Sequence, residues 1–215
     1  MNYKRKNRNF NKLHKIMKEL SKYKLGKISK NLDNLFNLAS NEQINQGIEW
    51  YKIANKEANK IAKKYNLDVY KVAQVISALS PRNKWKQNIK DANKLCEAYT
   101  LGLHPTDIKV CTFHSNKFKA FNILASNTQI TNNSLKTFNF VNNIAYLNND
   151  FLTIDIWHLR ACFNNMIKIN SATIGKIAYE QIKQLTLKKA AKLGLKGFEF
   201  QAILWLSAQT NINNN

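Results

Sequence analysis

The chain has 215 residues, of which 44% are hydrophobic and 11% aromatic, a composition that can build a packed interior and excludes a disordered polyelectrolyte. Its 34 Lys and Arg against 13 Asp and Glu give a formal net charge of +21, which predicts a polyanionic partner, nucleic acid first and an anionic membrane surface second. The three cysteines form no CxxC pair and the four histidines no HxxxH spacing, so neither a metal site nor a disulfide framework is expected. Without a signal-peptide core or a membrane-spanning run, the expected location is the cytoplasm or nucleoid, not the exterior.

The N-terminal residues 1–30 are dominated by Lys and Arg. Residues 1–9 show no apolar period and are expected to form a basic arm. The cations of this arm are Lys4, Arg5, Lys6 and Arg8. From Phe10 onward apolar residues recur at helical spacing, and Gly26 offers a stop. An organellar transit segment and a solvated tail without a role are the alternatives.

The remainder of the chain shows helical periodicity and no alternating strand pattern. It contains few prolines and glycines, and it shows neither a repeat nor an obvious linker. Expected N-caps are Asp68, Ser115, Asn133 or Ser134, Asp155 and Ser171. The expected helices span residues 44–65, 69–80, 85–99, 116–125, 135–147, a stretch after 155, 172–185, and two more introduced by Thr186 and by Lys196-Gly197. The pattern therefore predicts an all-α protein.

Asp155 lies in the stretch LTIDIWHLR, residues 152–160, with apolar residues on both sides. A helix N-terminus favours a negative charge, because its first N–H groups lack partners and its dipole is positive there. Asp155 can be a simple helix cap or a carboxylate held in place for chemistry. Lys136, which opens the preceding helix, can likewise be a solvated lysine or a reactive one.

Four blocks in order carry a family resemblance: VISALS at 75–80 followed by PRNKW at 81–85, KFKAFNI at 117–123, Lys136-Thr137 with Asn143, and TIDIWHLR at 153–160. Over roughly residues 70–165 the chain resembles the helix-hairpin-helix DNA glycosylase superfamily, in particular its endonuclease III branch. It is also similar to phage proteins whose pattern ends on a block matched by EFQAILW at 199–205.

The resemblance implies a two-lobed helical bundle of the glycosylase type over residues 31–215, with a cleft near 80–85 and 132–160. It also implies an enzyme that binds duplex DNA, flips a damaged or modified base and cleaves its N-glycosidic bond without a cofactor. Asp155 matches the family's aspartate, which stabilises positive charge on the deoxyribose. Lys136 matches the lysine that attacks the sugar in members that also cleave the strand.

The resemblance and the positive charge together imply a DNA-contacting set. Its members outside the basic arm are Arg82, Asn83, Lys84, Trp85, Lys117, Lys119, Asn132, Asn133, Ser134 and Arg160. The family's paired glycines before the lysine are replaced by residues 131–135, where asparagine tolerates a left-handed conformation. The alternatives are an inert nucleic-acid-binding or virion-associated protein and a phage base-modification enzyme.

Overall fold

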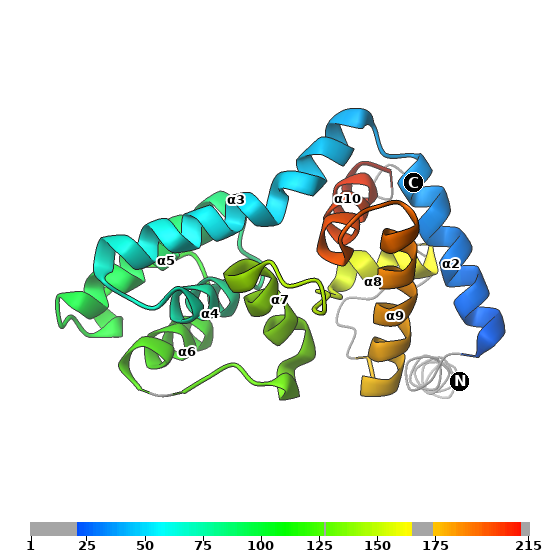
Figure 1. Ribbon diagram of the computed structural model, residues 1–215. Helices are drawn as coiled ribbons and strands as arrows, with labels where there is room; N and C mark the ends of the chain where they lie inside the picture. Colours follow the sequence, from blue (N-terminus) through cyan, green and yellow to red (C-terminus); the bar gives the residue numbers. More distant parts are fainter. Residues whose placement is uncertain (1–20, 127, 165–173, 212–215) are drawn as a thin grey trace, which may run out of the picture. The chain divides into compact units, whose positions relative to one another are not determined.

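The computed structural model describes residues 21–126, 128–164 and 174–211 (Figure 1). All regular elements in these ranges are helices, so the predicted all-α class is confirmed. Among these helices, none combines the length and the apolar composition that crossing a bilayer requires. The elements are α2 (Lys22–Asn37), α3 (Asn41–Tyr65), α4 (Val69–Leu79), α5 (Trp85–Thr100), η1 (Pro105–Asp107), α6 (His114–Ala125), η2 (Asn132–Ser134), α7 (Leu135–Tyr146), α8 (Ile156–Phe163), α9 (Lys176–Lys192) and α10 (Gly197–Asn211).

The chain forms two compact units. The terminal unit comprises the described parts of Met1–Glu49 and Ile154–Asn215, and the inserted unit is Trp50–Thr153. The chain leaves the terminal unit within α3 and returns to it one residue before Asp155.

The inserted unit is built around α4, which packs against α5, α6 and α7 (Figure 1). Its residues from Val72 to Leu79 are all buried. A helix covered on several sides has to be apolar all round, which explains the run VAQVISAL. The side chain of Asp68 accepts a hydrogen bond from the Lys71 N–H at 3.0 Å and begins the helix, as predicted. The one long polar side chain inside, Gln74, accepts a bond from the Ile130 N–H at 2.7 Å.

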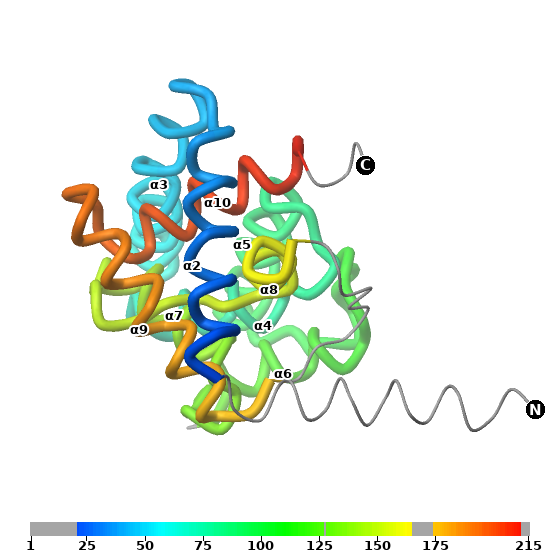
Figure 2. The backbone as a smooth tube through the Cα atoms, turned by 90° about the vertical axis from the view of Figure 1, so that its right-hand side faces the viewer, coloured from blue at the N-terminus to red at the C-terminus, as the bar shows by residue number. Residues whose placement is uncertain are grey.

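The terminal unit places α10 against α2, α8 and α9, and Figure 2 shows α2 running beside both α8 and α9. The first eight residues of α10, Gly197 to Leu204, are buried. Helix α3 meets α10 at Gly47, where a Cβ atom would lie only 2.7 Å from the Ile203 nitrogen. The two backbones therefore approach so closely that only glycine fits.

Three predicted helix boundaries were wrong. Gly26 lies inside α2, exposed and with open space around it, because the apolar stripe of α2 continues past it to Leu35. Helix α6 begins at His114, one residue before the predicted cap Ser115. Thr186 lies in the middle of α9 and starts no new helix. The predicted helix within residues 10–20 and the predicted cap Ser171 fall outside the described residues.

Candidate functional site

Asp155 is the N-cap of α8. The buried residue before it, Ile154, donates its N–H to the Tyr179 hydroxyl at 3.2 Å, which fixes the extended chain that leads into the helix. The Asp155 Oδ1 atom accepts the His158 N–H at 2.9 Å. The carboxylate is thus half-buried and held by its own helix, as a favourable N-cap should be.

His158, in the first turn of α8, is fully buried. The Thr186 hydroxyl donates to the Ile182 carbonyl at 2.8 Å, so it accepts from the His158 Nε2–H at 3.2 Å. This arrangement assigns the neutral tautomer with its proton on Nε2. Burial lowers the pKa of His158 to about 4. Among the described residues nothing donates to its Nδ1 atom. The geometry makes His158 a packing residue and not an acid–base group.

Arg160 lies on α8 with its guanidinium 4.5 Å from the centre of the Trp157 ring. Both side chains are half-buried. Stacking on an aromatic face orients a guanidinium without neutralising it. Arg160 therefore keeps its positive charge at the surface of the terminal unit, on the same helix that Asp155 begins.

In the inserted unit, Lys136 is exposed in the first turn of α7. The predicted contact residues Asn132, Asn133 and Ser134 form the short helix η2 directly before it and are all exposed. Left-handed residues of the described chain occur elsewhere and not at these three positions. The turn before Lys136 is thus a 3-10 turn. It does not contain the left-handed asparagine that could have taken the place of the family's glycines.

The loop between α4 and α5 carries three of the predicted contact residues, and a fourth, Trp85, begins α5. Arg82 is exposed, has a left-handed backbone (φ 58°), and places its guanidinium 5.7 Å from the centre of the Phe113 ring. Lys84 is also exposed. Trp85 instead packs its ring 4.9 Å from that of Trp50 and is half-buried. The loop therefore presents two cations to solvent, whereas the tryptophan that begins α5 is turned inward.

Asn83 is turned inward as well, toward a carboxylate that the sequence analysis did not single out. Asp91 is fully buried and accepts three hydrogen bonds, from Asn83 Nδ2 at 3.0 Å, Gln87 Nε2 at 2.8 Å and the Cys111 N–H at 2.9 Å. Only the Gln87 contact, four residues away on one helix, has a sequence signal. The other two come from loops that tertiary structure brings to Asp91.

Lys117 does not fit the predicted set of DNA-contacting residues. Its side chain is only 4% exposed, and its amine donates to the Ile108 carbonyl at 3.0 Å. A buried amine that satisfies a backbone carbonyl is not available to a phosphate, so Lys117 is a structural residue. Lys119, two positions later on α6, is exposed, and its contact with DNA stays a prediction.

The predicted contact residues thus divide between the two units, and each unit holds one predicted catalytic residue. Asp155 and Arg160 belong to the terminal unit, whereas Lys136 belongs to the inserted unit. The exposed predicted contacts of the inserted unit, besides Lys136, are Arg82, Lys84, Lys119, Asn132, Asn133 and Ser134. The arm residues Lys4, Arg5, Lys6 and Arg8 fall outside the described residues.

The thiols offer little chemistry. Burial raises the pKa of the Cys96 thiol to about 12 and also raises that of Cys162. Both therefore stay protonated and unreactive at neutral pH. Cys111 is exposed. In the part of the chain that the structure describes, no three His, Cys, Asp or Glu side chains gather in a way that could hold a metal ion.

These features define an all-helical, strongly basic protein with a capping aspartate and an exposed first-turn lysine on separate helices. The chain belongs to a family of unknown function, DUF7178, whose model matches residues 14–212. No curated protein and no solved structure matches it.

Proposed function

We propose that this protein binds DNA and cleaves the N-glycosidic bond of a flipped base, with Asp155 stabilising the positive charge that develops on the deoxyribose. The observation that carries the proposal is the placement of Asp155. It is a half-buried carboxylate at a helix N-terminus, in a chain whose net charge is +21. The resemblance of residues 153–160 to the glycosylase block supports the assignment of this chemistry to Asp155.

Water is the proposed nucleophile. The bond between C1′ and the base nitrogen breaks, the base leaves with the electron pair, and water adds its hydroxyl to C1′ while its proton leaves with the base. A negative charge fixed beside the sugar lowers the barrier, because its attraction to the positively charged sugar of the transition state is stronger than its attraction to the neutral sugar of the ground state. Lys136 is exposed, whereas a lysine nucleophile needs desolvation or cationic neighbours. Its exposure favours water, with Lys136 as the alternative nucleophile.

The second candidate is an inert nucleic-acid-binding protein. It is favoured by the hydrogen bond from the His158 N–H to Asp155, because helix capping alone explains an aspartate at this position. In this reading the exposed cations of the loop before α5 and of α6 bind phosphates, and no bond is cleaved.

Base release separates the two candidates. Wild-type protein, Asp155→Asn and Lys136→Ala are incubated with duplexes that carry a panel of damaged and modified bases, and released base is measured beside DNA affinity. Asparagine caps helices as well as aspartate does, so Asp155→Asn should fold and bind DNA yet release no base. Lys136→Ala should retain release. If only Lys136→Ala abolishes release, and borohydride traps wild-type protein on DNA, the lysine is the nucleophile. If wild-type protein binds DNA but leaves every base of the panel in place, the inert-binder candidate replaces the proposal.

A further inference from the structure

Two tyrosines form a stacked pair on the inserted unit. Tyr146 ends α7 and Tyr70 lies at the start of α4. Their rings are nearly parallel, with a centroid distance of 5.4 Å and an interplanar angle of 14°. Tyr146 is nevertheless 58% exposed, because Tyr70 covers one face of its ring and leaves the other face open to solvent. The pair therefore presents a flat aromatic surface to an external ligand.

Hydrogen bonds to neighbouring side chains hold both rings in place. The hydroxyl of Tyr70 is hydrogen-bonded to the side chain of Asn142, which is buried on α7. The side chain of Asn55 on α3 donates to the Ile144 carbonyl at 2.8 Å and to the Ala145 carbonyl at 3.0 Å. A donor to two of the last carbonyls of α7 fixes the helix end that carries the exposed ring. A ring on a fixed support loses little entropy when a ligand stacks on it.

Helix α3 carries a row of lysines next to its contact with α7. Asn59 lies one turn beyond Asn55 and donates to its side-chain oxygen at 3.1 Å. The neighbours of Asn59 on the helix surface are Lys56 and Lys63, and Lys60 continues the row one turn after Lys56. All three lysines are exposed, and none of them forms an ion pair with the described residues. This side of α3 therefore keeps three positive charges that no carboxylate neutralises.

An exposed aromatic face beside a row of cations is the arrangement with which proteins bind single-stranded nucleic acid. The cations attract the phosphates, and a base stacks on the free face of the ring. In a duplex the bases are paired and stacked on one another, so a base can reach this ring only from an unpaired strand. The carboxylate of Asp68, close to Tyr70 in sequence, already accepts the Lys71 N–H as the N-cap of α4.

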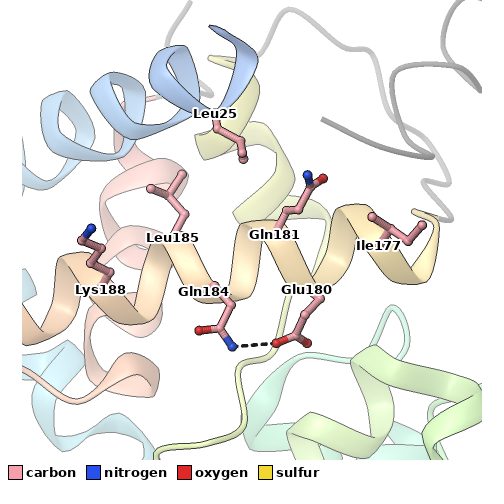
Figure 3. A pocket seen from close by; sticks show the side chains of 7 residues that line it. All are labelled: Leu25, Ile177, Glu180, Gln181, Gln184, Leu185 and Lys188. Carbon is pink, nitrogen blue, oxygen red and sulfur yellow. Dashed lines mark hydrogen bonds between the residues drawn. The ribbon is translucent and has the colours of Figure 1, made fainter. Parts of the chain in front are cut away.

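The open groove of about 680 Å³ along α2 and α9, on the terminal unit, lacks this combination. Figure 3 shows Glu180 and Lys188 on its wall, and Glu180 accepts a hydrogen bond from Gln184 at 2.7 Å. None of the described residues that line the groove is aromatic. A strand that reached Lys188 would meet a carboxylate and find no ring for its bases, so Lys188 provides a control position.

We propose that the surface formed by Tyr70, Tyr146, Lys56, Lys60 and Lys63 binds single-stranded nucleic acid. One base stacks on Tyr146, and the backbone follows the lysines of α3. This surface includes neither of the residues considered for base cleavage. The inference therefore does not depend on base release, and either proposal can fail while the other holds.

Photo-crosslinking of the full-length chain to a short oligothymidylate that contains one 5-iodouracil tests the stacked base. Irradiation links this base to an aromatic ring on which it is stacked. With protein below half-saturation, mass spectrometry should locate a crosslink at Tyr146. Tyr146→Phe keeps a ring and should retain the crosslink at this position, whereas Tyr146→Ala should lose it. Crosslinks at other residues alone, or no crosslink at all, would overturn the proposal.

Paired lysine variants test the row of cations. The double variant Lys56→Gln, Lys60→Gln should lower the crosslink yield at Tyr146 by about fivefold or more, because two phosphate contacts and their counterion release are lost. Its matched control, Lys188→Gln with Lys192→Gln, removes two exposed lysines at the same spacing from α9 and should leave the yield unchanged. An equal loss in both double variants would reduce the effect to net charge and overturn the proposal. So would an equal yield at Tyr146 from a fully paired duplex that carries the same 5-iodouracil.

Discussion

Acidification should destabilise this protein through one histidine, and His158→Phe should remove that part of the effect. His158 is fully buried, and burial lowers its pKa from 6.5 to about 4. Phenylalanine has a similar planar shape, does not titrate, and eliminates the buried Nδ1 atom that lacks a donor. Thr186 keeps its hydrogen bond to the Ile182 carbonyl in the variant, so no new unpaired group arises.

The sign and size of the effect follow from the two pKa values. The unfolded chain binds a proton at this histidine below about pH 6.5, whereas the folded chain binds it only below about pH 4. The contribution of neutral His158 to the unfolding free energy is therefore fully present above about pH 6.5. It falls as the pH drops toward about pH 4. At about 1.4 kcal/mol per pKa unit, the complete loss is about 3 kcal/mol. About 2 kcal/mol of it should fall between about pH 7 and about pH 5.

Urea denaturation at a series of pH values between these limits measures the effect, as the difference in unfolding free energy between wild type and His158→Phe. The carboxyl groups that also titrate near the lower end are common to both chains and cancel in this difference. His114→Phe is the matched control, because His114 is exposed at the start of α6. A pH slope for His158→Phe equal to that of wild type would refute the buried, neutral assignment. So would an equal loss of slope in His114→Phe.

Three further outcomes are expected. Gly47→Ala should destabilise by about 1–3 kcal/mol in urea unfolding, since its Cβ would lie 2.7 Å from the Ile203 nitrogen; Gly26→Ala, in open space within α2, should stabilise by about 0.5–1 kcal/mol. Asp91→Leu should destabilise by about 2 kcal/mol or more in the same assay because three partly buried donors lose their acceptor, and Asp91→Asn should cost less. DNA affinity, measured by fluorescence anisotropy, should fall steeply with salt, and deletion of residues 1–9 should flatten that slope without lowering the melting temperature; a flat slope for the full chain would contradict nucleic-acid binding.

Features set by local sequence were predicted well. Asp68 and Asp155 begin helices because a short carboxylate satisfies N–H groups two or three residues away, and this requires no tertiary contact. Gly26 was taken for a helix end because glycine costs about 1 kcal/mol in a helix interior. That cost is smaller than the gain from burying Ile28, Leu32 and Leu35 on the same helix. Packing overrode the local preference.

Features that depend on distant contacts were not predictable from the sequence. Nothing local distinguishes Lys117 from Lys119, yet one is buried against the Ile108 carbonyl and the other is exposed. Trp85 likewise follows a basic loop, and only its contact with Trp50 shows that it packs inward. A candidate contact residue can therefore be proposed from charge and position, while its burial is decided by tertiary contacts that the local sequence does not show.

The buried charges of the inserted unit explain how its basic loop is held. Asp91 binds the Cys111 N–H, and Lys117 binds the Ile108 carbonyl. The connection between α5 and α6 is thus fixed at two points by charged side chains with neutral partners. A buried polar group that loses its hydrogen bond raises the free energy of the folded state, so these two bonds oppose any shift of this connection.

The connection leads directly to Phe113, an aromatic side chain that is 53% exposed and lies under the Arg82 guanidinium. Asp91 also binds Asn83, the neighbour of Arg82. One buried carboxylate therefore holds both chain segments that present this cation and this ring. Because a side chain on a fixed support loses little entropy when it binds, Arg82 can contact a phosphate at lower cost than a cation on a free loop. That rigidity supports retaining Arg82 in the predicted DNA-contacting set.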